Sequence, residues 1–248
     1  MNFENFTFYK DRVAVNLLAK DIDNAADVVN VLDGAGVIGV LSKDFNSVED
    51  AVKYIKEMKK RIPVVSVGLG NGDPKQWKMA AEIGAETDPG HINQVFSTAG
   101  YTLGLLKGKG CEKTLVNALI SPAGEGGKVM ISTGPFSSQE RTIIDIDEAL
   151  KILKDAGVES VKFFNLKNMK NLDELREVAK SCVKNGIPVI EPTGGIDAAN
   201  IHDIVKICIE AGCEKVIPHV YSSAIDKNTG LTDVDIVNKI YGEIKRVF

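Results

Sequence analysis

The sequence contains no long apolar run and no surplus of basic charge, and both absences limit what the protein can be. No apolar stretch in its 248 residues approaches the roughly 20 residues that a membrane-spanning helix needs. The N-terminus also lacks the charged-then-apolar pattern of a secretion signal. The formal net charge of −4 argues against nucleic acid, because phosphate backbones attract basic surfaces. We therefore expect no membrane partner and no nucleic-acid partner.

Cysteine and histidine are also scarce. The cysteines show no CxxC spacing, and we expect reduced thiols in a cytoplasmic protein; they are Cys111, Cys182, Cys208 and Cys213. The histidines are too scattered for a metal-binding spacing such as HxxxH; they are His91, His202 and His219. Carboxylates at strand ends could still bind a divalent ion incidentally.

Apolar runs typical of buried strands alternate with helical patterns along the chain. Strands are predicted at residues 12–18, 37–41, 63–67, 91–96, 114–120, 158–164, 187–191 and 215–219. Helices are predicted at residues 24–33, 47–60, 74–83, 146–156, 172–185, 198–211 and 234–248. The near-continuous apolar content of the strands suits a parallel sheet that is buried on both faces.

This alternation predicts an α/β fold, a single (β/α)₈ TIM barrel over residues 1–248, since no linker divides the chain. Residues 121–139 interrupt the repeat, and the run 128–132 within them predicts a small hairpin insertion after strand five. A doubly wound sheet is the alternative architecture.

Barrel geometry gathers several reactive residues at one mouth, because active sites in this fold lie at the C-terminal ends of the strands. Lys162 lies near the end of the sixth predicted strand, Glu191 at the end of the seventh and His219 at the end of the eighth. Loops after other strands add Lys43, Asp44, Gly68-Leu69-Gly70-Asn71-Gly72-Asp73 and Ser222-Ser223.

Lys162 stands in the apolar, aromatic run Val161-Lys162-Phe163-Phe164, where a charge is hard to keep. An ordinary lysine has a pKa near 10.4, so only roughly one in a few thousand is a neutral nucleophile at pH 7. Desolvation or a neighbouring cation can lower this pKa to ~7–8, which suits imine formation. The alternative is a lysine that is paired with a carboxylate inside the barrel and stays charged.

The run Thr193-Gly194-Gly195, ahead of a helix expected near Asp197, is typical of a phosphate site. Glycines let backbone N–H groups approach an anion, and a helix N-terminus adds partial positive charge. Such sites are common after strands seven and eight of barrels, and Ser222 and Ser223 are further candidate donors. Gly-Gly pairs also occur in plain turns.

Three carboxylates at strand ends are candidate general bases: Asp44, Asp73 and Glu191. Each could instead cap a helix, and Asp73 before Pro74 has the pattern of an N-cap. His219 could belong either to the site or to the scaffold.

The run around Lys162, together with Glu191-Pro192-Thr193-Gly194-Gly195-Ile196, resembles the lysine and phosphate motifs of the 2-keto-3-deoxy-6-phosphogluconate (KDPG) aldolases. Further runs resemble the DgaF-like branch of that family: Gly68-Leu69-Gly70-Asn71-Gly72-Asp73-Pro74, His91-Ile92-Asn93-Gln94-Val95-Phe96, Ile131-Ser132-Thr133-Gly134-Pro135 and Ile217-Pro218-His219-Val220-Tyr221-Ser222-Ser223. The resemblance spans essentially the whole chain. It implies a class I aldolase barrel that forms a homo-oligomer, needs no metal or cofactor and acts on a small phosphorylated 2-keto acid.

Residue by residue, the resemblance implies that Lys162 is the imine-forming lysine and that Thr193-Gly194-Gly195 is the phosphate loop. The better-known KDPG aldolases carry a glutamate on strand two as general acid/base, followed by an arginine that binds the substrate carboxylate. Here Gly39 stands at the glutamate position and Lys43 near the arginine position. Lys43 could therefore hold the carboxylate, while the proton-transfer residue stays open.

We therefore predict that Lys162 forms an imine with the C2 ketone of KDPG, after which the C3–C4 bond breaks and glyceraldehyde 3-phosphate leaves. Water then hydrolyses the enamine to pyruvate. Glu191 or Asp44, directly or through a water molecule, is the predicted base, and His219 is a predicted substrate contact. The alternatives are the same chemistry on 4-hydroxy-2-oxoglutarate, a phosphosugar isomerase or epimerase with Lys162 as a charged clamp, and a non-catalytic protein that binds a phosphorylated ligand.

Overall fold

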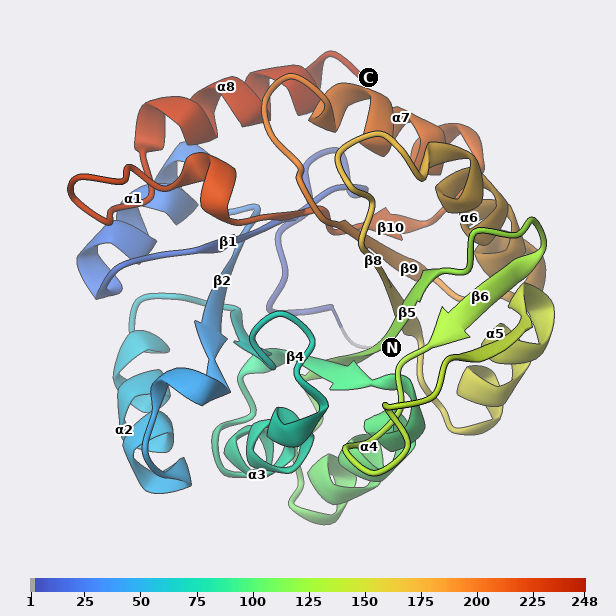
Figure 1. Cartoon of the computed structure of the whole chain (residues 1–248). Coiled ribbons are helices and arrows are strands. Elements are labelled where there is room, and N and C mark those ends of the chain that lie inside the picture. Colours follow the sequence, from blue (N-terminus) through green and yellow to red (C-terminus); the bar gives the residue numbers. More distant parts are fainter. Residues whose placement is uncertain (1–2) are drawn as a thin grey trace.

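Parallel strands form a closed eight-stranded barrel in this computed structural model, which describes residues 3–248, and helices surround it (Figure 1). The barrel strands are β1 (Val15–Leu18), β2 (Gly36–Leu41), β3 (Val65–Gly68), β4 (Gly90–Val95), β5 (Leu115–Pro122), β8 (Ser160–Phe164), β9 (Val189–Thr193) and a divided last strand, β10 (Lys215–Val216) with β11 (His219–Val220). β11 closes the ring because it pairs with both β9 and β1. The predicted barrel is confirmed, and the doubly wound alternative is wrong.

The helices on the outside are α1 (Ile22–Val31), α2 (Val48–Met58), α3 (Trp77–Thr87), α4 (Ala99–Gly108), α5 (Ile146–Asp155), α6 (Leu172–Asn185), α7 (Ile201–Glu210) and α8 (Val234–Lys245). The sequence predicts all of these except α4, which contains Gly100, Gly104 and Gly108. Glycine is a weak helix former, so packing against the barrel rather than propensity stabilises this helix.

Short polar side chains start several helices. Asp21, Ser47, Asp145 and Asp233 each accept a hydrogen bond from a backbone N–H in the first turn that follows. Asp73 does the same for the short 3₁₀ helix η2 (Pro74–Gln76), which confirms the predicted N-cap. Helix starts can thus be found locally in the sequence.

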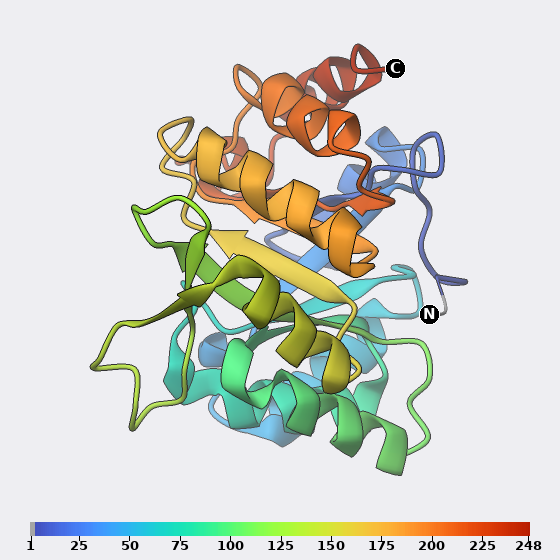
Figure 2. The ribbon, with the colours of Figure 1, turned by 90° about the vertical axis from the view of Figure 1, so that its right-hand side faces the viewer.

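The insertion after strand five consists of two strands, β6 (Lys128–Ile131) and β7 (Thr142–Asp145), which pair in antiparallel fashion. β6 also pairs with the end of β5, where Ile131 lies opposite Ile120. The hairpin and its loop project from the end of the barrel opposite the N-terminus (Figure 2). The predicted hairpin is confirmed.

The apolar core has two parts. The larger part fills the space between the strands and the surrounding helices. The smaller part closes the barrel at the N-terminal ends of its strands, and Phe3, Phe6 and Phe8 pack against it. Its buried members are Ala14, Val37, Val64, Leu115, Val189 and Ile217. Within residues 3–248, no helix combines the length and the apolar content needed to cross a bilayer.

Candidate active site

A layer of buried polar side chains lies inside the barrel above this apolar floor. Its members come from neighbouring strands and are almost fully shielded from solvent: Asn16, Ser66, His91, Asn117, Ser160, Glu191 and His219. Burying polar groups is unfavourable unless they form hydrogen bonds, so such a layer indicates a purpose beyond packing.

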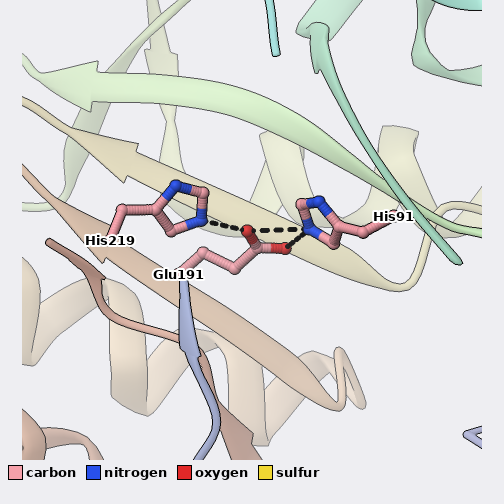
Figure 3. A group of neighbouring side chains, drawn as sticks. All are labelled: His91, Glu191 and His219. Carbon is pink, nitrogen blue, oxygen red and sulfur yellow. Dashed lines mark hydrogen bonds and ion pairs between the residues drawn. The ribbon is translucent and has the colours of Figure 1, made fainter. Parts of the chain in front are cut away.

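Glu191 is the centre of this layer (Figure 3). Its Oε2 accepts hydrogen bonds from His219 Nε2 at 2.6 Å and from Asn117 Nδ2 at 2.8 Å. Its Oε1 accepts from Ser160 Oγ at 2.5 Å and from His91 Nε2 at 3.0 Å. A carboxylate has roughly four lone-pair positions, and four donors therefore occupy Glu191 completely.

The donors also determine the charge of Glu191. Burial by itself raises the pKa of this carboxyl group, but attraction to His91 and the hydrogen bonds from His219 and His91 outweigh burial and hold the pKa well below its usual range. Glu191 is therefore a buried carboxylate anion. With no exposed surface and no free lone pair, it cannot contact a substrate while its four donors stay in place.

The hydrogen bonds of His219 define its tautomer. Nε2 faces the carboxylate and carries the hydrogen, so Nδ1 is an acceptor, and the Tyr221 hydroxyl lies 2.8 Å from it. Burial, and next the charge of Lys162, lower the pKa of His219 to about 3. His219 is therefore a neutral imidazole whose unprotonated nitrogen points toward the barrel mouth.

Lys162 lies one layer higher, beside this imidazole. Its Nζ donates to Asn93 Oδ1 at 3.0 Å and lies 3.3 Å from His219 Nδ1, and it also sits over the Tyr221 ring at 5.8 Å. Burial lowers the pKa of Lys162 to about 8, although the charge of Glu191 opposes the change. At pH 7 about one amine in ten is then neutral. Among the described residues, no carboxylate lies within ion-pairing distance of Nζ.

The apolar surroundings of Lys162 do not come from Val161 and Phe163, the residues directly beside it in the chain. Val161 and Phe163 are fully buried in the outer core, toward the helices, because successive side chains of a strand point to opposite faces. The pocket around Lys162 instead receives apolar surface from Phe164 and from Leu119 on β5. The apolar run therefore predicts correctly that Lys162 is buried. Within this run, however, only Phe164 adds apolar surface to the pocket.

The pocket around Lys162 is covered on one side by the loop after β3. Gly70, Asn71 and Gly72 line it, and all three have positive φ angles, of 68°, 53° and 73°. Lys43, in the 3₁₀ helix η1 (Ser42–Asp44), lays its side chain against Gly70 so closely that a Cβ there would overlap it. The predicted carboxylate-binding lysine thus lies beside a loop that reaches the pocket.

A second pocket of about 390 Å³ adjoins the first one and lies over the Gly194-Gly195 loop. Thr193, Ser222, Ser223 and His219 also line it. The two pockets share the residues Leu41, Asn71, Phe164, Thr193 and Tyr221. The pocket at Lys162 and the pocket over the glycine loop therefore meet at these shared side chains.

The glycines are required by close packing as well as by any ligand. Gly194 and Gly195 have φ angles of 116° and 71°, and a Cβ on either would overlap Asn165 or Asn168 of the loop after β8. No acceptor within residues 3–248 binds the backbone N–H groups of the two glycines, so these groups are available to an anion. Helix α7 begins only at Ile201, so its N-terminus is further along the chain than predicted.

The remaining predicted residues lie elsewhere or have other partners. Asp44 lines a neighbouring hollow beside Gly39 and does not line the Lys162 pocket. Gly39 itself packs under Leu18, whose Cδ2 would lie 2.9 Å from an added Cβ, so a glutamate there would displace this leucine. Ser223 Oγ donates to the Ile196 carbonyl at 2.5 Å.

Sequence reasoning does not identify Tyr221, Asn93 or Asn117 as parts of the site. Each points into the barrel for one of two reasons. It lies two residues along the chain from an inward-pointing residue, or it pairs with one on the neighbouring strand. Tyr221 follows His219 by two positions, and Asn117 pairs with Asn93, which lies two positions from His91. Strict alternation along strands β4 and β5, and continued one residue past β11, is the sequence signal that could have found them.

Two histidines and a carboxylate could in principle hold a metal ion. The ligand atoms of His91, Glu191 and His219 all lie within 4.8 Å of one another. An ion bound by them would replace the hydrogen bonds that both Nε2 atoms donate to Glu191. The predicted independence from metal stays a prediction.

Known proteins resemble this chain over nearly its full length. Residues 9–228 match the family described as KDGP aldolase. The chain is similar to a 2-dehydro-3-deoxy-phosphogluconate aldolase of Salmonella typhimurium (strain 14028s / SGSC 2262), with 43% identity over 243 residues that cover 98% of each chain.

Solved structures with the same fold are more distant. Thiamine phosphate pyrophosphorylase from Pyrococcus furiosus is 13% identical with a TM-score of 0.58, over 96% of this chain and 98% of that one. KGPDC from Streptococcus mutans is 10% identical with a TM-score of 0.57, over 96% and 99%. The 3-hexulose-6-phosphate synthase of Salmonella typhimurium is 15% identical with a TM-score of 0.57, over 95% and 100%. At these identities the likeness concerns the fold alone.

Proposed function

Because the chain belongs to the KDGP aldolase family and is thus a carbon–carbon lyase, we propose that it cleaves 2-dehydro-3-deoxy-6-phosphogluconate to pyruvate and glyceraldehyde 3-phosphate. One observation carries this proposal: the pocket of a buried lysine with a lowered pKa adjoins the pocket over a glycine loop whose backbone N–H groups are available. A substrate with a ketone at one end and a phosphate at the other fits that arrangement.

The first step is imine formation at Lys162. The neutral amine attacks the C2 ketone, a C–N bond forms, and the resulting carbinolamine loses its hydroxyl group as water. The product is a protonated imine. Asn93 accepts a hydrogen bond from Nζ and so positions the amine before it attacks.

The imine then serves as an electron sink. When the C4 hydroxyl loses its proton, the electrons of the C3–C4 bond move into the imine, glyceraldehyde 3-phosphate leaves and an enamine remains on Lys162. Protonation of the enamine at C3 and hydrolysis by water release pyruvate.

The two ends of the substrate have distinct contacts. The carboxylate next to C2 lies near Lys43 and the Gly70–Gly72 loop, because that loop lines the Lys162 pocket. The phosphate lies over Gly194 and Gly195, where Thr193, Ser222 and Ser223 line the same cavity. Oxygen atoms of a phosphate accept strongly from backbone N–H groups.

Trapping with borohydride tests the lysine. Pyruvate with sodium borohydride is expected to add a stable reduced adduct to Lys162, found by peptide mass spectrometry, and a Lys162→Arg variant is expected to stay unmodified. Arginine keeps the charge but is not a nucleophile at any accessible pH. An unmodified Lys162 in the wild-type protein would remove the proposed mechanism.

The alternatives separate by substrate. The same chemistry on 4-hydroxy-2-oxoglutarate would not need the phosphate contacts, and comparing kcat/KM for both substrates decides between them. The isomerase and the non-catalytic binding protein are wrong, since the chain belongs to an aldolase family. A homo-oligomer and a cytoplasmic location stay predictions.

A further inference from the structure

The lyase reaction needs a group that moves protons at the substrate, and the two predicted bases are poorly placed for it. Glu191 is fully buried and its oxygens accept hydrogen bonds from four donors. Asp44 lines a different hollow from Lys162. Gly39 offers no side chain at the position where a glutamate would be expected. Another residue that reaches the cavity must therefore transfer the protons.

Tyr221 reaches the cavity at the required position. It lines both the pocket around Lys162 and the pocket over the glycine loop, so it lies where the two pockets meet. Its ring centroid is 5.8 Å from Lys162 Nζ. A carbon chain attached to Nζ and extended toward Gly194 would pass beside this side chain.

Behind Tyr221, hydrogen bonds continue into the barrel. The Tyr221 hydroxyl lies 2.8 Å from Nδ1 of His219, and Nε2 of His219 lies 2.6 Å from Glu191 Oε2 (Figure 3 shows the second bond). Since the carboxylate holds the hydrogen on Nε2, Nδ1 is free to receive a proton. A buried anion behind an imidazole stabilises the imidazolium that then forms, as in hydrolase triads.

The groups that face His219 act in opposite directions on a proton transfer to it. The Glu191 carboxylate on β9 favours a proton on the imidazole, whereas burial and the charges of Lys162 on β8 and His91 on β4 oppose it and lower the pKa of His219 to about 3. Lys162 Nζ lies 3.3 Å from the same Nδ1. The Tyr221 hydroxyl, at 2.8 Å, is the closer of the two donors to Nδ1.

We propose that Tyr221 is the acid–base group of the aldolase reaction, with His219 as its proton acceptor and Glu191 as the fixed charge behind His219. This relay rests on the proposed function, because it acts on an imine at Lys162. It replaces the glutamate that strand two lacks at Gly39, and it assigns Glu191 a positioning role.

The protons balance over one turnover. During cleavage, the C4 hydroxyl gives its proton to the Tyr221 oxygen as Tyr221 gives its own to His219 Nδ1; the C3–C4 electrons enter the imine, and the aldehyde leaves. In the second half, His219 returns its proton to Tyr221 and Tyr221 protonates C3 of the enamine. The relay ends in its starting state, and hydrolysis releases pyruvate.

A Tyr221→Phe variant tests the relay apart from the lysine. Phenylalanine keeps the ring beside Lys162 and removes only the hydroxyl. We expect borohydride trapping with pyruvate at Lys162 to remain. The exchange rate of the pyruvate methyl protons in D₂O, measured by NMR, should fall by about 10²–10⁴-fold, as for loss of an acid–base group. Cleavage measured with lactate dehydrogenase should fall in kcat with little change in KM. Tyr101→Phe, which removes the hydroxyl of an exposed tyrosine on α4, is the matched control.

A His219→Gln variant provides the second measurement. Glutamine can still donate to Glu191 but offers no basic nitrogen to Tyr221, so we expect slow exchange with trapping retained, and the double variant should be no slower than either single one.

Methyl exchange at the wild-type rate in Tyr221→Phe would overturn the relay. Loss of trapping in that variant would also overturn it, because the hydroxyl would then act in imine formation at Lys162. Failure of the wild-type protein to trap pyruvate at Lys162 would instead remove the proposed function itself.

Discussion

At the scale of single residues, Lys162 shows that reactivity depends on partners that are distant in sequence. The atoms that contact its Nζ belong to Asn93 and His219, which lie 69 and 57 positions away. Neither is a carboxylate, so no ion pair at Nζ compensates for burial of the charge. The pKa of the amine falls to about 8 for this reason.

This pKa predicts how imine formation depends on pH. Only the deprotonated amine attacks a ketone, so the rate of borohydride trapping by pyruvate should rise with pH and level off above the Lys162 pKa of about 8. An unperturbed lysine, with a pKa near 10.4, would still be rising steeply there. The measurement is the initial rate of adduct formation at Lys162 in a series of buffers. A rate that is constant through this range, or adducts on exposed lysines such as Lys60, would contradict the prediction.

At the scale of secondary-structure elements, the pairing of β8 with β9 assembles the site. The parallel register places Lys162 opposite Glu191 and Phe164 opposite Thr193. The loops that follow the two strands then pack on each other, as Leu166 N donates to the Thr193 carbonyl at 2.9 Å. The phosphate loop is therefore shaped by the loop after β8 as much as by its own glycines.

A Gly195→Ala substitution should disturb this packing selectively. The methyl group would overlap Asn168, and the φ angle of 71° is unfavourable for alanine. We expect kcat/KM for the phosphorylated substrate to fall by about ten- to a hundredfold, the equivalent of one lost hydrogen bond to a charged group. The value for unphosphorylated 2-dehydro-3-deoxygluconate should change little.

Gly104→Ala in α4 is the matched control, because a Cβ at that position meets no atom within 4 Å and its helical backbone suits alanine. Both activities should be unchanged there. If Gly195→Ala reduced both substrates equally, the loop would have no specific phosphate role.

At the scale of the whole molecule, Glu191 connects the barrel across its centre. Its four donors come from three other barrel strands and from the divided last strand: His91 on β4, Asn117 on β5, Ser160 on β8 and His219 on β11. The apolar floor and the Phe3, Phe6 and Phe8 side chains below it keep water away from this layer. The polar layer is thus part of the stability of the fold and also part of the site.

A Glu191→Gln substitution should therefore destabilise the entire barrel. The amide NH₂ of glutamine is a donor, and it would face side chains that now donate to a carboxylate oxygen. Breaking a buried charged network in this way costs about 3–5 kcal/mol. For a chain of this size such a loss lowers Tm by roughly 6–20 °C. Thermal unfolding followed by circular dichroism measures it.

The control is Glu57→Gln, which removes the carboxylate of an exposed ion pair with Lys60 and should change stability by less than about 0.5 kcal/mol. Equal Tm values for Glu191→Gln and the wild-type protein would show that the layer contributes nothing to stability.

Much of the fold could be predicted from the sequence because its signals are local. Most strands are near-continuous apolar runs, and Asp73 and Ser47 begin helical segments by accepting hydrogen bonds from N–H groups two or three residues away. Helix α4 escapes prediction because its glycines weaken the local signal. The start of α7 at Ile201 also differs, since residues 198–200 form a turn first.

The sequence by itself determined the barrel, its hairpin insertion, the place of Lys162 on the sixth barrel strand and the place of the glycine loop on the next. Each of these depends on apolar periodicity or on the backbone preferences of glycine, which act over a few residues. Only the tertiary structure decided what surrounds Lys162 and what Glu191 does. Closing the ring brings β11 beside β9 and directs His91, Glu191 and His219 to one point, and the charges and hydrogen bonds of groups that meet across a barrel depend on distances that no local pattern contains.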